Sequence, residues 1–525
     1  MTLEVTRSTD VDTLEIKSNY SKTLVDIYHK VGGMVWDSQR KIWIMPIANA
    51  AKLYDLIPNF IDKSSLREWS DLVKSWDVDY ELIDISKCSL KFQPYQFQPI
   101  DAKKLLKLHR GINANEVGCG KTFEMVMVGE SIPQKKLVIC PATLRLNWEH
   151  EIKMVNPLAT VHIQYSDQPF KMVDGWNIIG YPSLTKFQSQ LEAARFNVVM
   201  ADEAHYIQAI NNFGRPSSQR ANCVLRLAAT AGYVFSITGT PKTSRNKNLY
   251  NILRMIHHPL TTGYRPFHNY GVRYCGGQKT QWGWDYNGNS YDEELNRQLQ
   301  PIMIRHLKKD VLPHLRKQRQ AIPVKVDLRQ YHQLISQYLK QRKNPNGTEL
   351  ATLNKAKQVV AIQKAAHSIE YTKDLIEAGE KVVIVTCYTE VVNKVMKAFK
   401  NCLKLVGGMS DKEKQTAINQ FQTGDIPIIV INVVAGGVGV TLTAASNMII
   451  NDLPWTTGEI EQAEGRIWRA GQTKTAMVYY MSAVDCPMDQ SLIDTIVYKS
   501  QTINAVVDRG LGEELNLREL LEKIL

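Results

Sequence analysis

The sequence predicts an α/β protein in which two domains built on parallel sheets follow one another along the chain. Short apolar runs rich in β-branched residues alternate with segments long enough for crossover helices, and this alternation occurs twice. The pattern is typical of parallel sheets, because neighbouring parallel strands must be joined by long crossover connections. A chain of 525 residues is also too long for one compact core, so we expect three or four domains.

Residues 1–88 are expected to form a small α+β domain. The elements that we predict there are a strand at 14–17, a helix at 22–31, and a hairpin with arms at 34–36 and 42–45. The hairpin carries Trp36 and Trp43, and a small local core is the simplest explanation for both indoles.

Two series of predicted strands define the larger domains, residues 89–262 and 346–490. The first series lies at 137–140, 176–181, 198–201 and 233–238, and the second at 382–386, 428–433, 448–451 and 477–481. Residues 263–345 become irregular, aromatic and glycine-rich and then basic and helical, so we interpret them as an insertion and a linker. Residues 491–525 are expected to form a C-terminal helical segment.

The charge of the chain favours an anionic partner. The sequence has 64 Lys and Arg against 52 Asp and Glu, a formal net charge of +12, and residues 301–350 carry 11 basic and 3 acidic residues. A solvated helix face or linker explains such a stretch as well as a polyanion-binding surface does. Nucleic acid is the first candidate for the polyanion.

Several other protein classes are disfavoured by what the sequence lacks. It has no run of 18 apolar residues to span a membrane, and its first residues do not form a secretory signal. The eight cysteines are scattered, with no CxxC pair and no zinc spacing, so we expect free thiols. We therefore expect an intracellular, cytoplasmic protein, associated with a nucleoid or acting in a virus-infected host cell.

The most specific local signal is a candidate phosphate loop at Gly118-Cys119-Gly120-Lys121-Thr122. Glycines let backbone N–H groups face phosphate oxygens, a lysine reaches the β- and γ-phosphates, and a hydroxyl ligates Mg²⁺. The full pattern has glycine where this chain has Asn115, so a chance glycine-rich turn is the alternative.

A pair of acids follows a predicted buried strand eighty residues further on. Asp202 can hold Mg²⁺ at the strand end, and Glu203 can orient or deprotonate an attacking water. Two acids at a strand end are by themselves a weak signal, but they gain specificity from the preceding phosphate loop.

Two arginines in the second half complete the candidate machinery. Arg466 and Arg469 are three residues apart, which would place them on one helical face, and an arginine finger stabilises the charge that develops during phosphoryl transfer. The alternative is that both arginines only pair with Glu461 and Glu464 on the same helix.

Together with further segments in the same order, these motifs resemble the Swi/Snf type of superfamily-two helicase motor. Residues 114–122 resemble the family sequence ADEMGLGKT, and Asp202-Glu203-Ala204-His205 matches its DEAH box. The other matching segments are Tyr95-Gln96 (the adenine-reading motif), 140–148 (motif Ia), 238–241 (motif III), 435–443 (motif V) and 462–472 (motif VI).

The resemblance implies two RecA-like lobes with ATP between them. The implied ATP ligands are Tyr95, Gln96, Gly118, Cys119, Gly120, Lys121, Thr122, Gly437 and Gly439, and Thr122 and Asp202 would bind Mg²⁺. The implied catalytic residues are Lys121, Asp202, Glu203, Arg466 and Arg469.

Segments 267–275, 282–288 and 303–312 further resemble the annealing-helicase (HARP) branch, and residues 1–88 resemble a HARP module more weakly. This implies a DNA-dependent ATPase: a translocase that remodels or reanneals branched or duplex DNA, in replication-fork and repair work. A strand-separating helicase and a passive DNA clamp with a degenerate motor are the alternatives. The sequence does not identify any protein partner.

DNA contacts of such a motor go mainly to phosphates and sugars. The candidates are Thr143, Tyr181, Thr441, Lys308 and Lys309, and a structural role in the local loop is the alternative for the first three. The chain departs from the family pattern at Asn115 (Asp in the family), at Gly465 (an acidic residue) and at Val440-Thr441 (Leu-Asn). None of these changes removes a catalytic candidate, so the motor is expected to be active.

Overall fold

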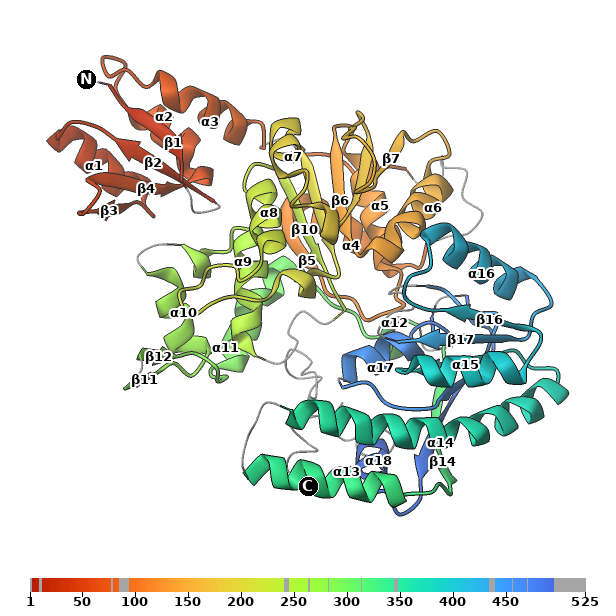
Figure 1. Cartoon of the computed structure of the whole chain (residues 1–525). Helices are drawn as coiled ribbons and strands as arrows, with labels where there is room; N and C mark the ends of the chain where they lie inside the picture. Colours follow the sequence, from red (N-terminus) through yellow and green to blue (C-terminus); the bar gives the residue numbers. More distant parts are fainter. Residues whose placement is uncertain are drawn as a thin grey trace. The chain divides into compact units, whose positions relative to one another are not determined.

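The computed structural model describes the chain except residues 1, 9–11, 77–78, 85–93, 240–244, 263–264, 282, 313, 344–347, 434–439, 456, 470 and 495–525. Contacts divide it into two compact units, residues 1–115 with 121–305 and residues 116–120 with 306–525. Each unit contains a parallel sheet with flanking helices (Figure 1). The predicted fold class, α/β with two parallel-sheet lobes, is confirmed.

The N-terminal part of the first unit is a four-stranded antiparallel sheet in the order β1-β2-β4-β3. Its strands are β1 (Glu4–Arg7), β2 (Thr13–Lys17), β3 (Val35–Asp37) and β4 (Ile42–Pro46), and its helices are α1 (Lys22–Val31), α2 (Ala50–Leu56) and α3 (Ser64–Lys74). Helix α1 begins where the Ser21 hydroxyl accepts a hydrogen bond from Leu24 N–H, and it ends at Gly32 with φ +77°. The predicted strand, helix and hairpin are confirmed.

The two hairpin tryptophans have different environments. Trp43 packs on Tyr28 with a 5.2 Å ring separation and belongs to the edge of the small core. Trp36 leans on Trp43 at 5.4 Å but stays 46% exposed. The local-core explanation therefore holds for Trp43 and only in part for Trp36.

The N-terminal sheet is attached to the first lobe by partly buried ion pairs. Arg254 donates to Asp12 at 2.9 Å, and Arg7 donates to Glu192 at 3.1 Å. Arg7 also donates to the Arg226 carbonyl at 2.7 Å. Because one partner of each pair is mostly buried, these contacts order the sheet against the lobe within the first unit.

The first lobe is a seven-stranded parallel sheet in the order β13-β5-β10-β9-β6-β8-β7. Its strands are β5 (Arg110–Asn113), β6 (Lys136–Cys140), β7 (Val161–Gln164), β8 (Trp176–Gly180), β9 (Val198–Asp202), β10 (Tyr233–Ile237) and β13 (Met303–Ile304). All residues of β6, β8, β9 and β10 are buried, so helices cover both faces of the sheet. Those helices are α4 (Phe97–Leu108), α5 (Lys121–Ser131), α6 (Arg145–Val155), α7 (Gln188–Ala194), α8 (Gln219–Ala228) and α9 (Tyr250–Met255).

The predicted insertion begins as a compact aromatic element of the first unit. It contains α10 (Pro266–Tyr274), the hairpin β11 (Gln278–Thr280) and β12 (Gly283–Asp285), and α11 (Asp292–Leu299). Gly271 and Gly277 allow the Tyr286 ring to pack, because a Cβ atom at Gly271 would lie 2.5 Å from that ring.

The second lobe is a six-stranded parallel sheet in the order β14-β19-β18-β15-β17-β16. Its strands are β14 (Lys317–Val324), β15 (Val382–Thr386), β16 (Cys402–Leu405), β17 (Ile428–Asn432), β18 (Asn447–Ile450) and β19 (Ala476–Ala483). Its helices are α12 (Lys308–Val311), α13 (Arg329–Lys343), α14 (Glu349–Glu377), α15 (Thr389–Ala398), α16 (Asp411–Thr423), α17 (Thr457–Glu464) and α18 (Pro487–Asp494).

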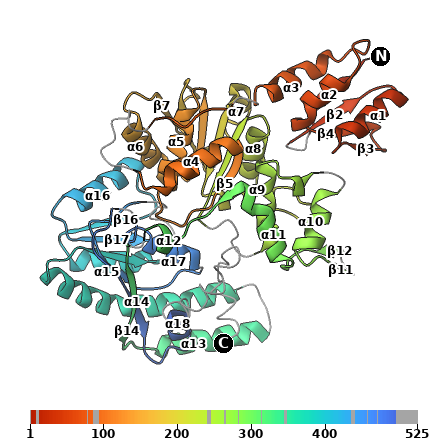
Figure 2. The same ribbon diagram turned by 180° about the vertical axis from the view of Figure 1, so that it is seen from behind.

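The structure corrects the expected end of the insertion at residue 345. Strand β14 pairs with β19 over its whole length, and α13 packs beside α14 (Figure 2). The basic stretch is therefore largely an edge strand and a covering helix of the second lobe. The predicted helical segment 491–525 lies outside the described residues from 495 onward.

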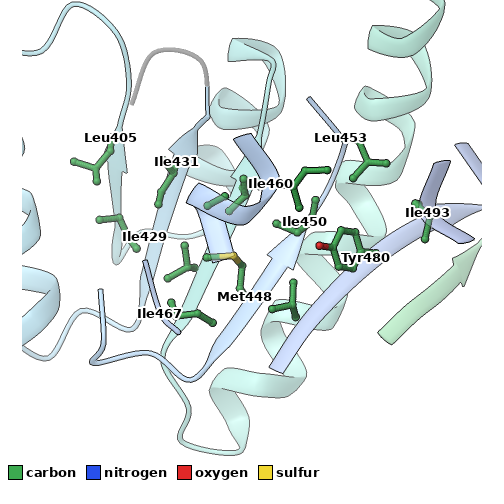
Figure 3. Packing of buried hydrophobic residues seen from close by; sticks show 14 of the residues in the cluster. Leu405, Ile429, Ile431, Met448, Ile450, Leu453, Ile460, Ile467, Tyr480 and Ile493 are labelled. Carbon is green, nitrogen blue, oxygen red and sulfur yellow. The ribbon is translucent and has the colours of Figure 1, made fainter. Parts of the chain in front are cut away.

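The core of the second lobe forms between its strands and α17. Ile429, Ile431, Met448, Ile450 and Tyr480 point to one face of the sheet, where Ile460 of α17 packs on them (Figure 3). Alternate strand residues supply this face, as the period of a strand requires. The described cysteines are free thiols, as predicted, and no helix in the described part of the chain is long and apolar enough to cross a membrane.

Candidate nucleotide site

The carboxyl ends of three adjacent strands build the first half of the site. Strand β10 lies between β5 and β9, and its last residue, Ile237, is level with both Asn113 and Asp202. The phosphate loop leaves β5 after Asn113, and the DEAH acids follow β9. Parallel register therefore brings segments eighty residues apart to one edge of the sheet.

The phosphate loop has the backbone that its glycines predict. Gly118 and Gly120 have φ values of +91° and +81°, and α5 starts at Lys121 immediately after them. Residues with positive φ just before a helix turn N–H groups toward an anion at its N-terminus. The Lys121 ammonium donates to the Asn115 carbonyl at 2.8 Å.

Asn115, which replaces the family's aspartate, bridges two buried carboxyl groups. Its side-chain amide donates to Asp101 at 3.0 Å and to the two oxygens of Glu124 at 3.0 and 3.2 Å. Asn113 donates to Glu124 at 2.6 Å. Burial, followed by the charge of Asp101, raises the pKa of Glu124 to about 8. Asparagine therefore suits position 115, because an aspartate there would place a third carboxylate beside Asp101 and Glu124 and repel them.

The DEAH acids are held by partners that the sequence reasoning missed. The Trp148 indole N–H donates to Asp202 Oδ2 at 2.8 Å, and the His205 imidazole lies 3.2 Å from Glu203 Oε2. Glu203 has φ +51°, a left-handed conformation that is uncommon outside glycine. Trp148 lies in motif Ia, but no spacing in the sequence pairs an indole with a carboxylate 54 positions away.

The charges at this strand end suit a divalent cation. Burial, followed by the neighbouring Glu203 carboxylate, raises the pKa of Asp202 to about 7. The Glu203 pKa is lowered, because hydrogen bonding and charge from His205 outweigh the opposing effect of burial. In the described part of the chain, no three His, Cys, Asp or Glu residues cluster to hold a metal by themselves. Asp202 and Thr122 offer a carboxylate and a hydroxyl oxygen, the ligand type that Mg²⁺ takes beside phosphate and water, and their role as its ligands stays a prediction.

The second unit surrounds residues 116–120 with cationic side chains. Glu116 N–H donates to the His306 carbonyl at 3.0 Å, and its carboxylate accepts from Lys308 N–H at 2.8 Å. A Cβ atom at Gly118 would lie 2.9 Å from both Lys308 Cε and Arg469 Cβ. Only glycine therefore fits at 118, by close contact as well as by its positive φ.

Lys308, a predicted DNA contact, has a buried side chain in this structure. The side chain is 1% exposed, its ammonium donates to the Trp468 carbonyl at 2.8 Å, and it lies 3.7 Å above the Trp468 ring. Burial lowers its pKa to about 7. Its ammonium is bonded within the protein, so this observation speaks against a DNA contact, while the Lys309 side chain lies outside the described residues.

Motif VI departs from the predicted helical geometry. Helix α17 ends at Glu464, and residues 465–467 form a turn. Leu442 N–H donates to the Arg466 carbonyl at 2.9 Å and holds this turn against the end of motif V. Arg466 and Arg469 therefore do not share a helical face, because the helix stops before both.

Glu464 is bound by partners from other elements, so it is not the partner of Arg466. Its buried carboxylate accepts from Lys317 at 2.6 Å, from Arg319 at 2.7 Å and from the Tyr480 hydroxyl at 2.7 Å. Although burial opposes it, the charge of Arg319 followed by that of Lys317 holds the Glu464 pKa far below its usual range. The alternative that Glu464 pairs with the arginines of its own motif is wrong.

Arg466 carries a buried positive charge with incomplete hydrogen bonding. It is 4% exposed, and its Nε and one Nη have no partner among the described residues. Burial lowers its pKa to about 10, so the guanidinium is still charged at neutral pH. Such an orphaned cation is costly unless an anion binds it.

The remaining candidates divide by burial. Tyr95 is half-buried and Gln96 is exposed, while the neighbouring Gln98 accepts from Tyr95 N–H at 2.9 Å. Tyr181, a predicted DNA contact, is buried, and its hydroxyl donates to the Asp202 carbonyl at 2.8 Å, which favours the structural role in its own loop. Thr441 is half-buried. Gly437, Gly439 and the Thr143 side chain lie outside the described residues.

We expect Asn115→Asp to destabilise the protein by about 1–3 kcal/mol, since it removes an amide donor between two buried carboxyl groups. The double variant with Asn115→Asp and Glu124→Gln should regain part of the lost stability, because the amide introduced at position 124 would then donate to the new carboxylate at position 115. Denaturant unfolding of both variants and of Glu124→Gln alone measures the coupling. Additive effects would contradict the network.

We expect Glu464→Gln to cost about 3–5 kcal/mol near neutral pH, because Lys317 and Arg319 lose their buried counter-charge. The depressed pKa makes this contribution fully present above the unfolded-state pKa of about 4.3 and lost as pH falls below it. Unfolding measured from pH 4 to 7 should therefore show a wild-type advantage that is constant above about pH 5 and shrinks below. Glu461→Gln serves as the control on the same helix.

Comparisons with known proteins agree with this geometry. Residues 28–388 match the family described as SNF2-related domain, and residues 364–471 match the helicase conserved C-terminal domain. The second match ends at Gly471, just beyond Arg466 and Arg469.

Two kinds of relative are similar to most of the chain. A Xenopus laevis protein, SWI/SNF-related matrix-associated actin-dependent regulator of chromatin subfamily A-like protein 1, is 24% identical over 507 residues, covering 89% of this chain and 51% of the relative. The human DNA annealing helicase and endonuclease ZRANB3 is 27% identical over 440 residues, covering 78% of this chain and 39% of the relative. The chain thus spans about half the length of such relatives, or less.

A solved Sulfolobus solfataricus SWI2/SNF2 ATPase core in complex with dsDNA aligns with a TM-score of 0.40 at 21% identity, covering 82% of this chain and 96% of that one. The sequence resemblance to the Swi/Snf motor and its annealing-helicase branch is confirmed by the family matches and the relatives. Since the SNF2-related match extends over more than half of its residues, the chain belongs to the SNF2-related family.

Proposed function

We propose that the chain is a DNA-dependent ATPase, a translocase that uses ATP hydrolysis to remodel or reanneal branched or duplex DNA. The observation that carries the ATPase part is the buried, incompletely bonded Arg466 guanidinium. A protein keeps such a charge where an anionic ligand supplies the missing acceptors, and phosphate suits a guanidinium especially well.

Each residue of the site has a role in that reaction. The N–H groups of the phosphate loop and the Lys121 ammonium bind the phosphates, so Lys121 exchanges its Asn115 acceptor for a phosphate oxygen. Glu203, positioned by His205, orients and deprotonates the attacking water. Arg466 and Arg469 stabilise the charge that develops on the transferred phosphoryl group. Thr122 and Asp202 would hold Mg²⁺, which neutralises phosphate charge when bound.

DNA as the partner is supported by the basic surplus and by the relatives. The chain has a formal charge of +12, and one relative is named as a DNA annealing helicase. Contacts through the backbone would give little sequence preference. Action on DNA implies an intracellular site of work.

Two alternatives remain to be separated by assay. A strand-separating helicase would displace a strand in the same substrates, whereas an annealing translocase would rewind them without displacement. A passive clamp is disfavoured, because a degenerate motor has no reason to keep a buried, incompletely bonded arginine in motif VI together with Lys121, Asp202 and Glu203 in the motifs of the first unit. Strand-displacement and annealing assays on one forked substrate distinguish the first two.

Lys121→Ala is expected to abolish ATP turnover while leaving DNA affinity within about twofold of wild type, because the ammonium serves the nucleotide. ATP turnover with and without duplex DNA, beside DNA binding by anisotropy, makes the test. Equal loss of both activities would indicate misfolding, and full turnover would contradict the assigned role. The exposed Lys30→Ala is the matched control.

Arg466→Met is expected to lower ATP turnover by about 10³-fold or more, as loss of an arginine finger does. The same change should leave the ligand-free protein as stable as wild type or more stable, because it removes an unpaired buried charge. Lower ATP turnover together with unchanged or higher stability is expected for a catalytic residue, whereas a structural residue would lose stability. Arg316→Met, at an exposed arginine of the same unit, should change neither. Loss of stability without loss of turnover would contradict the assignment.

A further inference from the structure

A cavity of about 1140 Å³ lies in the first unit, between the N-terminal sheet and the aromatic insertion. It is larger than most small-molecule sites, which measure about 300–1000 Å³. One wall comes from β2, β3, β4 and the segment after them, and the other from α9, α10, β12 and the turn at residues 212–215. The Arg254–Asp12 ion pair joins the two walls at 2.9 Å. None of the ATP-site residues lines it.

An exposed phenylalanine stands at the cavity on a rigid turn. Asn211 Oδ1 accepts from Phe213 N–H at 2.9 Å and from Arg215 N–H at 3.0 Å, and Asn211 N–H donates to the Arg215 carbonyl at 2.9 Å. Phe213 is nevertheless 83% exposed. Since the turn is ordered by its own hydrogen bonds, the ring is presented to a ligand at little further cost in conformational entropy.

Gly214 fixes where this turn lies. Its φ is +75°, and a Cβ atom there would come 2.4 Å from the Phe267 ring. The turn is therefore seated directly against α10, which places Phe213 and Arg215 over the aromatic insertion.

A second aromatic surface lies on the insertion side of the cavity. Trp284 is 39% exposed, the His268 ring meets it edge-on at 4.7 Å, and the Tyr286 ring lies behind, parallel to within 2°. The Tyr286 hydroxyl and His268 Nδ1 share a hydrogen bond of 2.7 Å. Trp284 is thus a partly exposed ring whose orientation is set by its neighbours.

The charged side chains that line the cavity favour an anion. Three arginines and one aspartate are present, and the aspartate is already paired with Arg254. Arg215 and Arg265 are both exposed, next to Phe213 and to α10 respectively. Rings that can stack on flat heterocycles beside guanidinium groups are the combination that binds unpaired nucleotides.

We propose that this cavity binds unpaired nucleotides of a DNA strand at a branch, with bases against Phe213 and Trp284 and phosphates against Arg215 and Arg265. The inference rests on the proposed function, because it names the part of a branched DNA substrate that the first unit recognises. The interior of a duplex does not fit this arrangement, since base pairs that are stacked on both sides have no free faces for the rings. The cavity gives the enzyme a preference for DNA with single-stranded segments.

Binding to two DNA molecules tests the proposal. One is a fork with a single-stranded oligothymidine arm, and the other is a blunt duplex with the same base-paired length. Phe213→Ala and Trp284→Ala should each weaken fork binding about 5- to 100-fold and leave duplex binding within about twofold. Phe60→Ala, at a phenylalanine that is 80% exposed and outside the cavity lining, is the matched control and should change neither.

Salt dependence tests the phosphate contact separately. Arg215→Ala should reduce the slope of log affinity against log salt by about 0.7 for the fork, as the loss of one single-strand phosphate contact does. An unchanged slope, or equal weakening of fork and duplex binding by the Phe213 and Trp284 variants, overturns the proposal.

Photocrosslinking of the unaltered protein makes the test independent of how the variants fold. Halogenated pyrimidines in the single-stranded arm should crosslink to peptides that contain Phe213 or Trp284, and crosslinks confined to other peptides overturn the assignment. Duplex-stimulated ATP turnover should persist in both variants. If the wild type itself shows no DNA-stimulated turnover, the proposed function fails, whereas the binding and crosslinking results decide the cavity alone.

Discussion

The parallel register of β5, β10 and β9 is the constraint on which the first half of the nucleotide site depends. It sets Asn113, Ile237 and Asp202 level at one edge of the sheet, so the phosphate loop and the DEAH acids leave the sheet together. A shift of one strand by one residue would turn Asp202 toward the opposite face. The buried apolar residues of these strands hold that register, and the candidate site residues lie at the strand ends.

Several buried polar groups at that edge have partners from other segments. Asn115 links Asp101 and Glu124, Trp148 binds Asp202, and Tyr181 closes on the Asp202 carbonyl. Because unpaired polar groups are costly in a low-dielectric interior, these pairings leave few other arrangements for the loop. In the second unit, the Glu464 carboxylate is fully paired, whereas the Arg466 guanidinium, two residues later, is incompletely hydrogen-bonded. The first stabilises the turn, and the second is left for an anion.

Elements that are buried on both sides were predictable from the sequence. Strands such as β15 and β17 are continuous β-branched runs, because both faces of an internal parallel strand meet helices. Strand β14 was missed, since its first four residues, Lys317–Gln320, are all polar and lie at the edge of the sheet, so that they resemble a basic linker. The catalytic motifs were predictable because nucleotide chemistry restricts both residue type and spacing, as at Gly118–Thr122 and Asp202–Glu203. Trp148, the partner of Asp202, and His268, the partner of Trp284, could not be assigned these contacts from the sequence, because no fixed spacing links the residues of either pair.

The sequence by itself determined the fold class, most strands of the two series, and the candidate residues for binding phosphate, holding a cation and activating water. Their identity follows from local chemistry, which a short motif contains in full. Only the tertiary structure decided which charges are buried. It buried Lys308 against Trp468, paired Glu464 with β14 and left Arg466 incompletely bonded. It also brought Phe213 and Trp284 to one cavity. Burial and long-range pairing depend on how distant segments pack, and no local pattern of residues specifies that packing.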